Sequence, residues 1–193
     1  GQIVGFPQLF LIADTWGDVL ARLAVEPPYP KWYIERTTDQ ISEINIFPKS
    51  EDVKTDKAQL NFKREKDGTW RVIDYLAGTE SHLVDDAKWQ KLLPTIKRPS
   101  GVDVAVHKVR DRDYSQWGIG DNSAAVEIRF QSTTEQGTAY TDGSLLLIGD
   151  LEPGGEAYYG KSAQEGVTQP VLLFPKVWVE TIFGLYEDIP YAD

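Results

Sequence analysis

Two segments of the chain, residues 85–97 and 175–187, repeat one pattern of apolar positions at helical spacing. Each stripe starts with a tryptophan, Trp89 or Trp178, and continues at offsets of about three, four and seven residues, which is one face of a helix. The following members are Leu92, Leu93 and Ile96 in the first segment and Thr181, Ile182 and Leu185 in the second. We therefore predict two helices whose tryptophans point into a core.

Short runs of alternating apolar and polar residues precede both helices. Ahead of the first we predict an extended stretch near 32–35 and strands at 41–47, 59–66 and 69–73, with a hairpin turn at Asp67-Gly68. Ahead of the second we predict strands at 124–130, 144–149 and 157–160, with room for a further one at 171–174. A strand at 102–106 and a short helix capped by Asp111 link the two groups.

Grouped strands followed by a helix favour an α+β fold with mainly antiparallel sheets. The pattern predicts two β-β-β-α units that form an internal pseudo-repeat. We expect three parts: an N-terminal helix and connector over 1–40, a first unit with its linking strand over 41–110, and a second unit over 111–193.

The N-terminal part predicts an amphipathic helix that starts near Pro7 and carries apolar residues from Leu9 to Leu23. Its polar face lacks the lysines and arginines of a membrane-surface helix, so we expect the helix to pack on the domain. Residues 26–30 hold three prolines and predict a stiff connector. No stretch of the chain approaches the ~20 apolar residues that span a bilayer.

Charge and composition narrow the choice of partners. The 193 residues include 30 acidic and 20 basic side chains, a formal net charge of -10. Phosphate backbones and anionic lipid headgroups would repel such a chain, so we expect no nucleic acid and no direct binding to anionic membranes. With 0 cysteines, disulfides and thiolate chemistry are excluded. The chain starts at Gly1 rather than methionine, and we expect it to derive from a longer gene product.

Five short motifs resemble, in their order, the bacterial family called domain of unknown function 4340. They are Asp67-Gly68-Thr69-Trp70-Arg71-Val72, the helix start Asp85-Asp86 with Lys88-Trp89-Gln90-Lys91-Leu92-Leu93, Trp117-Gly118-Ile119, Leu147-Ile148-Gly149 and Ala157-Tyr158-Tyr159-Gly160. The resemblance covers about residues 40 to 187. Trp117 and Ile119 stand where the family usually has tyrosine and leucine, and the family's proline is missing from the loop at 121–123.

The resemblance implies an extracytoplasmic domain, in the periplasm or at the cell surface, tethered by an N-terminal anchor outside this sequence. Members of the family have no assigned reaction and are often encoded beside components of gliding-motility-type ABC transporters. We therefore expect a non-catalytic binding or accessory module whose partner is a membrane protein of an ABC transporter-like complex. The alternative is a cell-envelope enzyme acting on a glycan or peptide. The sequence sets no oligomeric state.

Metal and cofactor chemistry finds little support in the residue spacing. The two histidines, His82 and His107, lack the spacing of a zinc centre, so we predict no metal site and no cofactor. Residues 111–122 begin like a calcium loop but lack its glycine and its final glutamate. Residues 118–123 lack the lysine and the following helix of a phosphate-binding loop.

Catalytic side chains are equally unsupported. Ser123 and Ser162 lie outside any GxSxG context. Glu152 and Glu156 flank a Pro-Gly-Gly sequence and indicate an acidic loop rather than the acid–base pair of a glycosidase. We therefore predict no catalytic residue.

Aromatic residues remain as candidates for a contact surface. Tyr158 and Tyr159 are neighbours on one predicted strand, so their side chains point to opposite faces of the sheet. One of them can fill the core while the other is presented outward near Trp117. Trp117, Tyr158 and Tyr159 are thus the binding candidates, against the alternative that they only fill packing gaps.

Overall fold

The structure is a computed structural model that describes residues 13–25, 37–55, 57–107, 109, 113–134, 136–163 and 169–192. The chain divides between residues 33 and 34 into two compact units. The first contains helix α1 (Asp14–Val25), and the second contains every other described element.

Helix α1 begins at Asp14, whose carboxylate is favourable at a helix N-terminus. The predicted start near Pro7 lies outside the described residues. Within this unit Trp16 is 67% exposed, and Val19 and Leu20 are exposed as well. The expected packing of the helix on the domain concerns the relation between the two units and stays a prediction.

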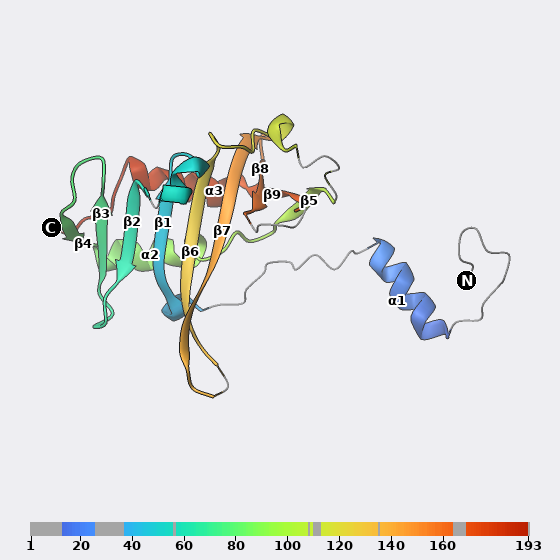
Figure 1. The fold of residues 1–193 in the computed structure, drawn as a ribbon, viewed down its shortest axis with the longest axis horizontal. Coiled ribbons are helices and arrows are strands. Elements are labelled where there is room, and N and C mark those ends of the chain that lie inside the picture. Colours follow the sequence, from blue (N-terminus) through green and yellow to red (C-terminus); the bar gives the residue numbers. More distant parts are fainter. Residues whose placement is uncertain are drawn as a thin grey trace. The chain divides into compact units, whose positions relative to one another are not determined.

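A nine-stranded antiparallel sheet, counted over the described residues, dominates the second unit, in the order β4-β3-β2-β1-β6-β7-β8-β9-β5 (Figure 1). The strands are β1 (Ile41–Phe47), β2 (Leu60–Arg64), β3 (Trp70–Asp74), β4 (Ser81–Leu83), β5 (Asp103–Val106), β6 (Ala124–Thr133), β7 (Ala139–Leu151), β8 (Ala157–Ser162) and β9 (Val171–Pro175). This mixed helix-and-strand fold with an antiparallel sheet agrees with the predicted α+β class.

Helices α2 (Asp86–Ile96) and α3 (Lys176–Phe183) lie behind the sheet in Figure 1 and cover one of its faces. Four short 3-10 helices complete the described elements: η1 (Thr38–Gln40), η2 (Ser50–Thr55), η3 (Ser115–Trp117) and η4 (Gly184–Tyr186). Strand β4 was not predicted, whereas β9 lies at the further strand for which the sequence pattern left room at 171–174 and β5 lies at the predicted linking strand. The predicted stretch near 32–35 lies outside the described residues.

The starts of both covering helices follow from local chemistry. The Asp85 carboxylate accepts a hydrogen bond from the backbone N–H of Lys88, 3.1 Å away, and so caps α2. Pro175 is the N-cap of α3, next to a position where its missing N–H is harmless. The cap predicted at Asp111 lies outside the described residues. Before η3 the Asp113 carboxylate instead accepts a hydrogen bond from Ser115 N–H.

Both tryptophans lie in the core between the helices and the sheet, which confirms their predicted inward direction. Trp89 is 0% exposed and stacks on Phe62, with ring centroids 4.5 Å apart. Trp178 is 1% exposed and packs beside Phe174. The Trp178 indole Nε1 donates a hydrogen bond to the carbonyl oxygen of Ile96, 3.2 Å away, and so joins α3 to the end of α2.

The opposite face of the central strands carries a network of charged and amide side chains. The Asn61 amide donates hydrogen bonds of 2.6 Å to the side-chain oxygens of Asn45 and Glu43. The Asn45 amide donates in turn to the Glu127 carboxylate. The Arg129 guanidinium bridges Glu43 and Glu127 at 3.1 and 2.9 Å. Its hydrogen bond with Glu127 raises the pKa of Arg129. These mutual bonds allow the polar side chains to be partly buried.

Candidate functional site

A hollow at one end of the central strands of the sheet is the candidate site. It lies where β1 and β7 end and β6 and β8 begin, beside α3, at the top of Figure 1. We call it the upper-edge pocket, and its volume is about 340 Å³. This is near the lower end of the ~300–1,000 Å³ of small-molecule sites, so the pocket is suited to one side chain or a small group.

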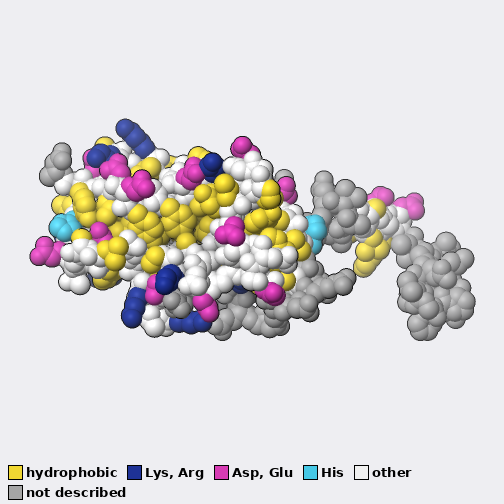
Figure 2. Space-filling view, turned by 90° about the horizontal axis from the view of Figure 1, so that it is seen from above, with side chains coloured by type: hydrophobic (Ala, Val, Ile, Leu, Met, Phe, Trp, Pro, Cys, Tyr) yellow, Lys and Arg dark blue, Asp and Glu magenta, His cyan; other side chains and the backbone are white. Residues whose placement is uncertain are grey.

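Apolar side chains come from half of the residues that line the upper-edge pocket. They are Pro48, Ala124, Ile148, Tyr158, Val179 and Phe183. Figure 2 looks down on this edge and shows hydrophobic side chains gathered into a band along the molecule. A contiguous apolar band bordered by polar residues is typical of an interaction surface rather than of a solvated edge.

Two carboxylates from different elements stand at the rim of the upper-edge pocket: Asp150 from β7 and Glu180 from α3. The Glu180 carboxylate lies 3.8 Å from the Lys176 ammonium in an exposed pair one helical turn apart. Such a pair holds the carboxylate only weakly. The rim is therefore acidic and open to a second cationic group.

The Asp150 side chain lies close to the backbone of the turn at Gly118. Gly118 has a φ of 67°, a conformation that favours glycine, and a Cβ at this position would meet the Asp150 carboxylate. A Cβ on Gly149 would meet the carbonyl oxygen of Trp117. The turn at 117–119 thus lies directly on the end of β7, which explains the glycines of two motifs singled out in the sequence.

The two neighbouring tyrosines of β8 lie on different faces of the sheet. Tyr158 pairs with Phe174 and lines the upper-edge pocket. Tyr159 pairs with Leu173 and packs with Trp117 against a buried cluster on the other face. The structure thus brings Trp117 and Tyr159 together, and it separates both from Tyr158. Trp117 does not line the pocket; its carbonyl oxygen lies against Gly149, which does.

Sequence reasoning did not identify Lys161 and Tyr114, which complete the cluster around Trp117 and Tyr159. The Lys161 ammonium lies 5.0 Å from the centroid of the Tyr114 ring, a cation–π distance. Burial lowers the pKa of Lys161. The Tyr114 hydroxyl donates to the carbonyl oxygen of Gln169 and accepts from its N–H. These bonds tie η3 to the start of β9, so we assign the cluster a structural role.

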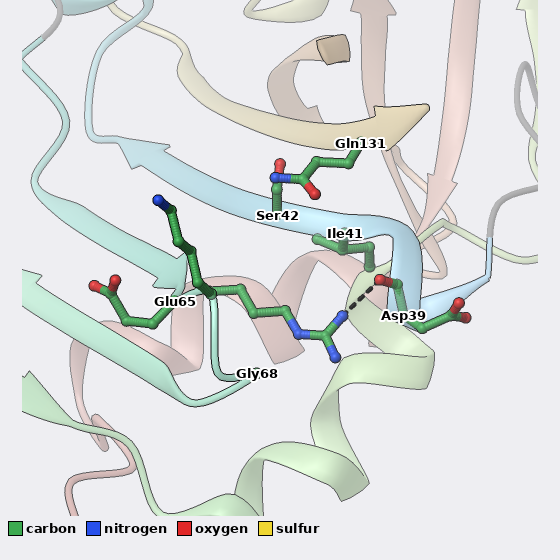
Figure 3. Close-up of a pocket in the computed structure, with 8 residues that line it drawn as sticks. Asp39, Ile41, Ser42, Glu65, Gly68 and Gln131 are labelled. Carbon is green, nitrogen blue, oxygen red and sulfur yellow. Dashed lines mark hydrogen bonds between the residues drawn. The ribbon is translucent and has the colours of Figure 1, made fainter. Parts of the chain in front are cut away.

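A second hollow, about 370 Å³, lies at the opposite edge of the sheet (Figure 3). Its lining includes Asp39, Ser42, Arg64, Lys66 and Gln131. The Arg64 guanidinium donates a 2.5 Å hydrogen bond to the backbone carbonyl of Asp39. The Asp39 carboxylate points away from this bond, which is the dashed line in Figure 3. The Thr37 hydroxyl is the main cause that lowers the pKa of Asp39. The lining is polar and of mixed charge, with its main cation engaged, and it offers little apolar area to a ligand.

Other side chains considered in the sequence serve local structure. Glu152 accepts hydrogen bonds from the N–H groups of Gly154 and Glu156. The Ser123 hydroxyl donates to the Gly120 carbonyl, 2.7 Å away. The His82 ring meets Tyr191 edge-on near the C-terminal end of the chain. Among the residues that the structure describes, no group of three His, Cys, Asp or Glu side chains could hold a metal ion.

The acidic rim was also missed by sequence reasoning. Asp150 and Glu180 are separated by two strands and a loop, and no short motif contains both. The only sequence signal was Tyr158, which lies between them in the chain. The convergence of these groups depends on the pairing of β7 with β8 and on the position of α3.

None of the helices in the described part of the chain has the length and hydropathy needed to cross a membrane. Comparison of the chain with models of protein families, with curated proteins and with solved structures gave no match.

Proposed function

We propose that this chain is a non-catalytic binding or accessory module of a membrane-associated complex and that it acts outside the cytoplasm. The observation that carries the proposal is the upper-edge pocket, at the side of the molecule where Figure 2 shows a band of hydrophobic side chains. Exposed apolar patches of this kind serve protein–protein contact. The membrane association and the compartment rest on the motif order that resembles the domain of unknown function 4340 family.

The chemistry of the upper-edge pocket favours binding over catalysis. Its hydroxyl at Ser123 is engaged in a turn with Gly120, and both histidines lie elsewhere in the chain. Asp150 and Glu180 stand at the rim of apolar walls, an arrangement that can orient a partner by charge. An apolar centre with a polar rim is the usual organisation of a protein interface.

Photocrosslinking in the source organism tests this proposal. Leu151 and Tyr140 lie near opposite ends of β7, with 41% and 44% exposure, and each can be replaced by a photoreactive benzoylphenylalanine. Leu151 pairs with Tyr158 of the pocket, whereas Tyr140 lies in the distant hairpin, so it is a matched control. We expect one discrete adduct with a membrane protein from position 151, none from position 140, and loss of the adduct when Tyr158 is changed to Ser.

Equal labelling from the two positions, or an adduct that survives Tyr158→Ser, would refute the upper edge as the contact surface. Hydrolysis of a glycan or peptide by the purified chain, abolished by a single carboxylate or serine substitution, would favour the envelope-enzyme alternative.

We further infer that the two halves of the sheet are structural repeats. Strands β1 to β4 followed by α2, and β6 to β9 followed by α3, have the same antiparallel order on the two sides of the β1–β6 pair. This order supports the repeat inferred from Trp89 and Trp178, with β4 added to the first unit and the further strand at 171–174 present in the second. The two hollows then lie at corresponding places in the two halves. The second hollow lies at the start of β1 and the end of β6, and the upper-edge pocket lies at the start of β6 and the end of β1.

An experimentally determined structure tests the repeat. We expect residues 41–96 to superimpose on 124–183 with Trp89 and Trp178 in equivalent positions. A different strand order in the two halves, or tryptophans that occupy different layers after superposition, would contradict it.

A further inference from the structure

We propose that the upper-edge pocket takes one apolar side chain of a partner protein and that its acidic rim binds a lysine or arginine next to that side chain. This assignment rests on the proposed function and names the chemistry of the partner. It commits to an extended partner segment with an aromatic or aliphatic residue beside a basic one. Two features of the pocket carry it: its size and its charge.

The size and lining match one buried side chain. A volume of about 340 Å³ leaves room for a single large apolar group with its backbone at the mouth. Val179 and Ile148 are part of the core beneath the pocket, while Tyr158 and Phe183 are half-buried and form its sides. Burial of an apolar side chain against such walls provides most of the affinity.

The charge of the pocket selects the neighbour of that side chain. Among the described residues that line it, the acidic or basic side chains are those of Asp150 and Glu180. The chain as a whole has a formal charge of -10. Both the local rim and the long-range field therefore favour a cationic residue and repel an acidic one.

The two carboxylates reach the pocket from different elements. The Asp150 carboxylate, at the end of β7, lies against Gly118, where the missing Cβ leaves space for it. Glu180 lines the same pocket from α3. A cationic residue of the partner is therefore met by negative charge from both the sheet and the helix.

Peptide titration of the isotopically labelled 193-residue chain tests the assignment by NMR. The probes are N-acetyl-Phe-Arg-amide, N-acetyl-Phe-Glu-amide and N-acetyl-Ala-Arg-amide. We expect Phe-Arg to bind with the largest shifts at Tyr158 and Phe183. Loss of the aromatic ring in Ala-Arg should weaken binding about tenfold. Asp150→Asn and Glu180→Gln should each weaken Phe-Arg binding about two- to fivefold, as for exposed ion pairs.

Glu187→Gln is the matched control, because Glu187 is an exposed carboxylate on the turn after η4 and does not line the pocket. This change should leave Phe-Arg binding unaltered. Equal affinity for Phe-Arg and Phe-Glu, or shifts centred on Lys161 and Tyr114, would overturn the assignment. Self-association that buries Tyr158, detected by sedimentation, would also overturn it, because the occupant would then be a second copy.

The two proposals can fail separately. A specific adduct from position 151 without peptide discrimination would reject the partner chemistry and retain the binding module. Selective Phe-Arg binding without an adduct at the membrane would retain the pocket's specificity and reject the proposed function.

Discussion

At the scale of single residues, the two core tryptophans have the same burial but different hydrogen bonding. The Trp178 indole N–H donates a hydrogen bond to the carbonyl of Ile96, whereas the buried Trp89 Nε1 has no hydrogen-bond partner among the residues that the structure describes. An unpaired buried N–H costs about 1–3 kcal/mol, and a made hydrogen bond contributes about 1 kcal/mol. The two rings therefore contribute differently to stability although the sequence places them in the same pattern.

We predict that Trp178→Phe lowers the free energy of unfolding by about 1–2 kcal/mol more than Trp89→Phe. Both changes replace the indole by the smaller phenyl ring and remove its N–H group. Trp178→Phe leaves the Ile96 carbonyl without its donor, whereas Trp89→Phe removes an N–H that was not hydrogen-bonded. Chemical denaturation of the two variants measures the difference. Equal losses, or a larger loss at Trp89, would show that the hydrogen bond to Ile96 contributes little.

At the scale of elements, the loop between β7 and β8 is held by one carboxylate. Glu152 accepts hydrogen bonds of 3.0 and 2.7 Å from the N–H groups of Glu156 and Gly154. The bond from Glu156, followed by that from Gly154, lowers the pKa of Glu152 below its ordinary value of 4.5. The lowered pKa means that the ionised form is favoured in the folded state.

This shift predicts a pH-dependent effect of Glu152→Gln. A carboxyl whose pKa is lowered by folding stabilises the fold above its unfolded pKa and loses that contribution as the pH falls through the folded value. Wild type should therefore be more stable than the variant at neutral pH, and the difference should shrink below about pH 4.5. Denaturation at a series of pH values checks this, with Glu187→Gln as the charge control. A difference that stays constant into acid would contradict the loop contacts.

Strand patterns in the sequence were predictive where one face of the strand is buried. β6 alternates buried and half-buried positions and was found at nearly the predicted bounds. β4 was missed because its three residues, Ser81–Leu83, are all exposed and give no alternation. β7 runs from Ala139 and is longer than predicted, since the hairpin with β6 extends it beyond the helix-covered part.

At the scale of the whole molecule, charge and topology act together on the proposed contact surface. The formal charge of -10 creates a field that attracts a basic partner before contact. Salt screens that field over about 10 Å at 0.1 M ionic strength, while the apolar pocket is less affected. Partner binding at the upper edge should accordingly keep its apolar selectivity at high salt and lose part of its charge selectivity.

The sequence by itself determined the secondary structure class, the buried faces of α2 and α3 and several turns, because periodicity and turn chemistry are local properties. The upper-edge pocket was decided only by the tertiary structure. Its residues come from strands and a helix that are far apart in the chain. They meet because antiparallel pairing places the ends of β1 and β7 beside the starts of β6 and β8, next to α3. Asp150 and Glu180 become a joint rim through this pairing, and no local pattern encodes their distance.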